Sequence, residues 1–186
     1  MRNRLLIVAA LLCYFMVASS QTQMKFMGIS FGSTATVFKQ ALAKKNCKFV
    51  SEETFAPGQK KWDFHGSFWE LKQCKITLFD YKSNGKITSA YVTQDCYDYS
   101  MDQYNIMIHE LIMDITSKYG KPTDTRIVQV VSNNVETYWK LKTGTIRIHY
   151  NNSKPVYVGI EYKSNLEYDI QFKEESNKRR KAKQDI

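Results

Sequence analysis

The chain has 186 residues, with 27 Lys plus Arg against 18 Asp plus Glu and a formal net charge of +9. Its composition, 43% hydrophobic and 13% aromatic, excludes a disordered polymer, because a chain so rich in apolar side chains collapses in water. A chain of this length forms one domain with its own core and needs no disulfide scaffold or structural metal to fold.

Residues 1–20 predict a secretory signal peptide, because a basic start precedes an apolar run over 5–17. That run is shorter than the roughly 20 residues of a membrane-spanning helix. Ala18 and Ser20 fit the small-x-small rule, so we expect cleavage after Ser20 and a periplasmic or extracellular protein. A retained N-terminal anchor is the alternative. Cys13 lacks the small preceding residue of a lipoprotein signal.

Removal of the signal peptide leaves 25 basic against 18 acidic side chains, a charge of +7. The tail over 173–186 carries +3 of that charge and contains no Gly, Pro or aromatic residue. This composition predicts a charged, solvated helix or a frayed terminus. The alternative is weak contact between Lys178–Lys183 and an anionic membrane surface. The body over 21–172 carries only +4, so we expect no nucleic-acid partner.

The first half of the chain predicts one helix and several strands. A strand over 25–31 precedes a helix over about 35–45, for which Ser33 or Thr34 is the cap. A strand over 48–55 follows, and the region 61–94 is rich in strand formers. Within it, Ser83-Asn84-Gly85 predicts a tight hairpin turn before a returning strand over 87–93.

The second helix has the clearest signals. Ser100 and Gln103 form a capping box, and Gly120 with Pro122 ends the helix. The apolar stripe between them consists of Tyr104, Met107, Ile108, Leu111 and Ile115. Strands are expected near 126–131, 136–142, 145–150 and 155–162, with turns at Thr143-Gly144 and Asn151-Asn152-Ser153.

Three cysteines remain after export, Cys47, Cys74 and Cys96. They allow one disulfide and a free thiol, or three thiols. Cys74 and Cys96 flank the predicted hairpin at nearly equal distances from its turn, which makes them a candidate disulfide. None belongs to a CxxC sequence, so neither zinc nor thioredoxin chemistry is indicated.

The two halves, about 24–97 and 98–164, read as pseudo-repeats of a helix followed by antiparallel strands. Phe38 and Leu42 match Leu111 and Ile115 at one offset, and two strand segments match as well. Two such units predict an α+β fold, with one antiparallel sheet and both helices packed on a single face. The domain then covers 21–172, and a short charged helix or tail follows it.

This order of elements resembles a group of uncharacterised small secreted proteins of bacteria. The resemblance rests on K-F-M-G-I-x-F, on Gly66 and Phe68 with the later Cys74, and on the sequence Lys-Tyr-Gly-Lys-Pro over 118–122. The tandem layout is also similar to the beta-lactamase-inhibitor-protein fold and to SmpA/OmlA (BamE-like) envelope domains. That resemblance implies protein binding without catalysis. The chain departs from the SmpA/OmlA pattern in lacking a lipobox cysteine.

No catalytic or cofactor site emerges from the sequence. His109-Glu110 opens like a zinc-protease motif, but Met113 stands where the second histidine is needed. His65 and His149 are expected to face solvent. No nucleophile elbow and no glycine-rich phosphate loop is present. We therefore expect no metal, no cofactor and no enzyme activity, and an enzyme of unrecognised type is a minor alternative.

The strongest functional signal is the sheet face turned away from the helices. Period-two alternation sends aromatic and basic side chains to that face. We predict that this face binds a protein through Phe79, Tyr81, Tyr91, Tyr138, Arg147 and Tyr157, in a monomer. One alternative is ordinary aromatic pairing on a solvated sheet. Another is that helices or the basic tail cover the face and make these rings part of the core.

Overall fold

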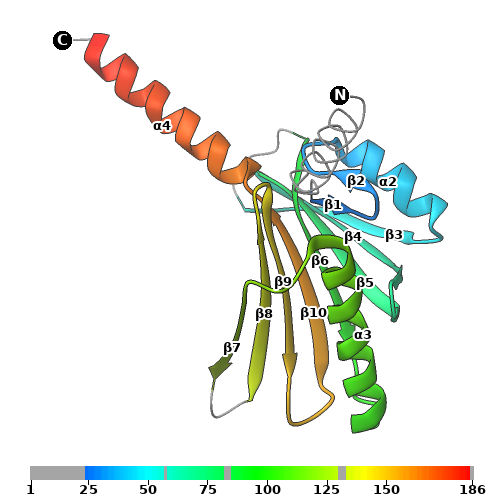
Figure 1. The fold of residues 1–186 in the computed structure, drawn as a ribbon. Helices are drawn as coiled ribbons and strands as arrows, with labels where there is room; N and C mark the ends of the chain where they lie inside the picture. The colour runs from blue at the N-terminus through cyan, green and yellow to red at the C-terminus, as the bar shows by residue number, and fades with distance from the viewer. Residues whose placement is uncertain (1–23, 57, 82–84, 130–132, 185–186) are drawn as a thin grey trace, which may run out of the picture.

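The computed structural model describes residues 24–56, 58–81, 85–129 and 133–184. The predicted signal peptide therefore lies outside the described residues. The described chain has an α+β fold, as predicted, with three helices, one eight-stranded antiparallel sheet and a small two-stranded sheet (Figure 1).

The predicted strand over 25–31 is in fact a tight hairpin. β1 (Lys25–Phe26) and β2 (Ile29–Ser30) pair antiparallel through Phe26 and Ile29. Met27 and Gly28 connect them with φ angles of 51° and 89°. A two-residue turn with both φ angles positive matches the twist of a hairpin, and glycine takes such an angle without strain.

The helix α2 (Ala35–Lys44) is confirmed close to its predicted bounds. Thr34 is its N-cap, because its hydroxyl accepts a hydrogen bond from the Val37 amide. Phe38 and Leu42 are fully buried and anchor the helix to the sheet.

The large sheet has the strand order β3-β4-β5-β6-β10-β9-β8-β7. Its first half consists of β3 (Lys48–Ala56), β4 (Gln59–Phe68), β5 (Leu71–Asp80) and β6 (Ile87–Asp95). Its second half consists of β7 (Asp124–Gln129), β8 (Asn134–Leu141), β9 (Gly144–Asn151) and β10 (Tyr157–Ser164). The halves meet where β6 pairs with β10, from Ser89 with Lys163 to Asp95 with Tyr157. Part of the predicted turn around Asn84 lies outside the described residues.

The helix α3 (Met101–Tyr119) carries the predicted capping box, in which the Ser100 hydroxyl and the Gln103 side chain each bond the other's backbone amide. All five residues of the predicted apolar stripe are buried. The Tyr104 hydroxyl adds a polar link to the second half of the sheet. It donates a hydrogen bond to the Tyr157 carbonyl at 2.8 Å and accepts one from the Asn151 amide at 3.2 Å.

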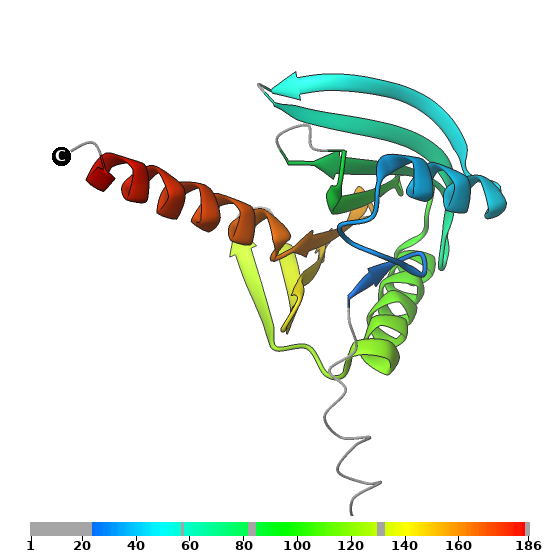
Figure 2. The ribbon, with the colours of Figure 1, turned by 90° about the horizontal axis from the view of Figure 1, so that it is seen from above.

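One continuous core lies between the sheet and the helices α2 and α3. Side chains of the inner sheet face, including Ile76, Val92, Ile148 and Ile160, are fully buried in it. Figure 2 shows α2, α3 and the β1–β2 hairpin together on the concave side of the curved sheet. The convex side, which we call the outer face, is therefore left to the alternate side chains of each strand.

The helix α4 (Leu166–Gln184) starts directly after β10 and projects away from the sheet (Figures 1 and 2). The helix continues without a break past position 172, where the sequence analysis places the boundary between the domain and its tail. Leu166 and Ile170 are half-buried, whereas Tyr168 and Phe172 are exposed. Among the described residues, no helix is both long and apolar enough to cross a membrane.

The predicted Cys74–Cys96 disulfide does not form. Cys47, Cys74 and Cys96 are all free and buried. The register pairs Lys75 with Thr93, which places Cys74 one residue beyond that pair and Cys96 three residues beyond it. The spacing from the turn is only nearly equal, and continuing the register past Lys75 and Thr93 sets Cys74 opposite Gln94, so Cys96 lies beyond its reach across the two strands.

Candidate binding face of the sheet

Five of the six residues predicted to bind a partner follow the outward alternation of their strands, and Tyr81 lies one residue beyond the end of β5. The register sets three of them in one row across the sheet, in which Tyr91 faces Glu161, Glu161 faces Arg147, and Arg147 faces Tyr138. Tyr157 lies on β10 beside this row. Phe79 and Tyr81 lie nearer α4, and the Tyr81 hydroxyl accepts a hydrogen bond from Gln171 of that helix at 2.9 Å. The structure thus brings four of the six together.

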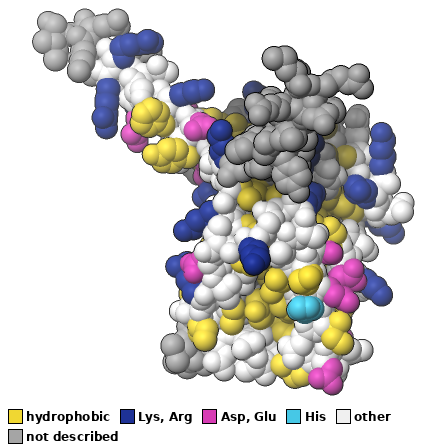
Figure 3. All heavy atoms as spheres, viewed as in Figure 1, with side chains coloured by type: hydrophobic (Ala, Val, Ile, Leu, Met, Phe, Trp, Pro, Cys, Tyr) yellow, Lys and Arg dark blue, Asp and Glu magenta, His cyan; other side chains and the backbone are white. Residues whose placement is uncertain are grey.

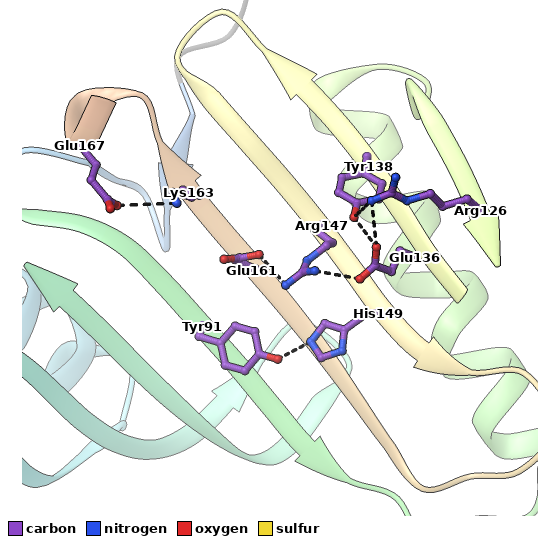
Figure 4. Close-up of polar contacts among 9 residues, drawn as sticks. All are labelled: Tyr91, Arg126, Glu136, Tyr138, Arg147, His149, Glu161, Lys163 and Glu167. Atoms are coloured by element: carbon purple, nitrogen blue, oxygen red, sulfur yellow. Dashed lines mark hydrogen bonds and ion pairs between the residues drawn. The ribbon is translucent and has the colours of Figure 1, made fainter. Parts of the chain in front are cut away.

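The centre of the outer face is a cluster of three rings, Tyr91, His149 and Tyr157, which we call the ring cluster. The His149 ring stacks on Tyr91 at 5.5 Å between centroids and 16° between planes, and it lies 5.3 Å from the Tyr157 ring. The Tyr91 hydroxyl is hydrogen-bonded to Nε2 of His149 (Figure 4). The rings come from β6, β9 and β10, so the pairing of the two sheet halves assembles the cluster.

Gly159 makes room for this arrangement. It is paired with Thr93 on one side and with His149 on the other. A Cβ atom at position 159 would overlap the imidazole of His149. The histidine ring therefore lies over the glycine backbone and reaches Tyr91 on the far strand.

A network of charges continues the row toward β7. Arg147 bonds Glu136 through Nη1 and Glu161 through Nη2, each at 2.8 Å. Arg126 donates to the Tyr138 hydroxyl at 2.8 Å and lies over that ring at 4.9 Å from its centroid. The Tyr138 hydroxyl in turn donates to Glu136 (Figure 4). This Glu136–Arg147–Glu161 network fixes each side chain through at least one charged partner.

The electrostatics of the face follow from partial burial. Burial, together with the nearby positive charge of Arg147, lowers the pKa of His149 to about 4. Burial acts to raise the pKa of Glu136, but the hydrogen bond from Tyr138 and the charges of Arg147 and Arg126 outweigh it and lower that pKa. At neutral pH the face therefore holds a neutral imidazole near the ionised carboxylate of Glu136.

The functional groups of the outer face are aromatic rings, guanidinium groups and carboxylates in fixed positions. Aromatic rings and guanidinium groups are common in protein interfaces. Nε2 of His149 is already engaged by Tyr91. In the described part of the chain, no three His, Cys, Asp or Glu side chains are grouped so that they could hold a metal ion.

Strand alternation assigns His149 to the outward face, but it was not among the predicted contacts. His149 was expected to face solvent, but it is half-buried between two tyrosines, whereas His65 is exposed as predicted. Glu136 and Arg126 were not singled out either. The sequence feature that could have indicated the packing of His149 is Gly159. A glycine in the middle of a strand often marks a close approach by another group.

Comparisons with known proteins do not extend this description. No family model, no curated protein and no solved structure matches the chain.

Proposed function

We propose that this protein is a non-catalytic binding module and that its partner is another protein docked on the outer face. The observation that supports this is the ring cluster. Its three rings are held by mutual contacts and are only partly buried, on a sheet face opposite the one that α2 and α3 cover. Rings that are already ordered lose little conformational entropy on contact, so a partner gains most of their burial energy.

The charges around the rings suit the rim of such an interface. Arg126 has a side chain that is 58% exposed, whereas Glu136 beside it is 13% exposed. A charged group at the rim steers a partner and sets its register more than it adds affinity. We therefore expect a partner that places apolar side chains on the ring cluster and an acidic group near Arg126.

A photo-crosslinking amino acid tests this proposal. Placed at Tyr157, it should capture the partner from native cell extract, and placed at Met113 on the exposed side of α3, it should not. Once the partner is identified, Arg126→Glu should weaken its binding by about tenfold, the effect of roughly 1.4 kcal/mol. Lys44→Glu on α2 is the matched control and should leave binding unchanged. Equal capture from positions 157 and 113 would contradict the proposal.

A second candidate function is attachment to an anionic surface through α4. The helix projects from the body and carries Lys or Arg at 173, 178, 179 and 180, and the described side chains there are exposed. Figure 3 shows dark blue basic side chains along this helix and yellow hydrophobic ones nearer the body. Basic side chains near an anionic bilayer contribute about 1 kcal/mol each.

Vesicles containing phosphatidylserine distinguish this second function. Binding should fall as salt rises and should disappear when residues 173–186 are deleted. The matched control replaces Lys140 and Lys154, two exposed lysines of the body, by glutamine. If the truncated protein binds the vesicles as well as the full chain does, α4 is not the attachment site.

Three further parts of the proposal rest on sequence pattern. Export after cleavage at Ser20 would place a monomer in the periplasm or outside the cell. The two halves would be repeats, since each consists of a helix followed by four strands and the matched segments fall on β5 with β9 and on β6 with β10. The resemblance to beta-lactamase-inhibitor-protein-like and SmpA/OmlA domains rests on this order of elements alone.

A further inference from the structure

A cleft of about 380 Å³ opens on the helix side of the molecule, away from the outer face. Five separate segments line it: the β1–β2 hairpin, the end of α2, the end of β4 with the β4–β5 turn, the end of α3, and β10. The lining side chains with chemistry to offer are Lys25, Lys45, Lys118, Phe68, Trp69 and Tyr162. The volume lies in the range of small-molecule sites.

The charge of the cleft is one-sided. Lys25, Lys45 and Lys118 come from different elements, and no Asp or Glu lines the cleft with them. In the described chain, none of the three is ion-paired with a carboxylate. Lys45 and Lys118 stand at the C-terminal ends of α2 and α3, whose dipoles contribute about half a negative charge each. Three full positive charges exceed that contribution, so the cleft keeps a net positive field.

The floor and wall of the cleft are aromatic. Phe68 and Trp69 lie 4.7 Å apart between ring centroids, and Phe68 is packed 6.1 Å from the Tyr162 ring. Phe68 is almost fully buried, whereas Trp69 is half-exposed. A flat ring entering the cleft would therefore meet Trp69 first.

The hydroxyl of Tyr162 adds a polar contact. Tyr162 is 1% exposed and lines the cleft, yet its hydroxyl has no hydrogen-bond partner among the described residues. A hydroxyl that opens onto a cleft is normally satisfied by water or a ligand. It can donate to an oxygen atom of a bound anion.

We propose that this cleft binds a small anion attached to an aromatic ring, such as an aryl phosphate or aryl carboxylate. Lys25, Lys45 and Lys118 bind the charged group, the Tyr162 hydroxyl donates to it, and Trp69 stacks on the ring. This site is independent of the outer face, so protein docking there can fail or succeed without affecting it.

Phenyl phosphate is the first probe, and Trp69 reports its binding. Trp62 and Trp139 are buried outside the cleft lining, so quenching of tryptophan fluorescence should come from Trp69 and vanish in Trp69→Phe. Inorganic phosphate tests the charge alone, and benzylamine tests the ring with the opposite charge. Phenyl phosphate should bind about tenfold more tightly than inorganic phosphate, and benzylamine should not bind.

Three variants test the residues, with affinity measured by calorimetry. Lys45→Gln combined with Lys118→Gln should weaken phenyl phosphate binding by about tenfold, whereas the control pair Lys140→Gln with Lys154→Gln should not. Tyr162→Phe should weaken binding and leave the melting temperature unchanged, because the hydroxyl has no protein partner to lose. Benzylamine binding as tight as that of phenyl phosphate would overturn the proposal. So would equal affinity in the cleft pair and the control pair, or an unchanged affinity in Tyr162→Phe.

Discussion

His149 makes the stability of the protein depend on pH in a defined window. Its pKa in the folded protein is about 4, below the ordinary value of 6.5. As the pH falls, the unfolded chain therefore takes up this proton before the folded protein does, and stability is lost between pH 6.5 and 4. A shift converts at about 1.4 kcal/mol per unit, and the ring keeps some contact with water, so we expect a loss of about 1–2 kcal/mol.

Urea unfolding at pH 7 and at pH 4.5 measures this loss. His149→Gln removes the titrating group and should flatten the pH dependence in that window. The matched control is His109→Gln, on the exposed side of α3, which should keep it. An unchanged pH dependence in His149→Gln would contradict the assignment.

Gly159 is the second residue on which the outer face depends. Gly159→Ala places a Cβ where the imidazole now lies, so the ring has to leave Tyr91. Overpacking of this kind costs about 1–3 kcal/mol. The displaced ring gains water, so the pKa of His149 should rise toward 6.5. NMR titration of the histidine resonances measures this, with Ser89→Ala on the same face as the control. An unchanged His149 pKa would mean that the ring does not rest on Gly159.

For single residues, the sequence predicts which face of the sheet a side chain points to better than it predicts which other side chains it contacts. Alternation along each strand assigned Tyr91, Arg147 and Tyr138 to one face correctly, because side-chain direction depends only on strand parity. Which of them touch depends on the register between β6 and β10, which joins residues far apart in the chain. The burial of His149 was not predicted for that reason, since the rings that cover it belong to other strands.

Among the elements, α3 holds the second half of the sheet through a hydroxyl group. Tyr104→Phe keeps the ring but leaves the Tyr157 carbonyl and the Asn151 amide without their present partner. An unsatisfied buried group costs about 1–3 kcal/mol, so we expect a loss of stability of that size. Urea unfolding measures it. Tyr97→Phe, at an exposed tyrosine just before the helix, should cost nothing measurable, and an equal loss in both variants would contradict the role of Tyr104.

The same helix shows why some elements are predictable. The cap, the stripe and the terminating Gly120 of α3 all lie within one short stretch of chain, and all were predicted. The hairpin at Met27 was missed, because two residues on either side of a turn resemble a single short strand. The Cys74–Cys96 pairing was wrong because the register sets Cys74 opposite Gln94, and approximate spacing from a turn does not fix which residues are opposite.

At the scale of the whole molecule, the three buried thiols among the described residues report global unfolding. Burial raises the pKa of Cys74 to about 12 and that of Cys96 to about 11, and it also raises the pKa of Cys47. A buried, protonated thiol is a poor nucleophile, so labelling of the folded protein by a disulfide reagent at pH 8 should be slow at all three positions. In denaturant, without any reductant, all three should react quickly. A single fast thiol in denaturant would mean that two of them are paired after all.

The pairing of β6 with β10 also determines the order in which the strands of the sheet pair during folding. β6 can pair with β5 as soon as the first half of the chain is present, but its other edge stays open until β10, more than sixty residues later, arrives. Pairing of segments so distant is slow, and an open edge attracts other chains meanwhile. Pulsed hydrogen exchange during refolding should show the β6 amides that face β10 protected together with β9, and early protection of those amides would contradict this. The protein is thus most exposed to aggregation while half of its sheet is complete.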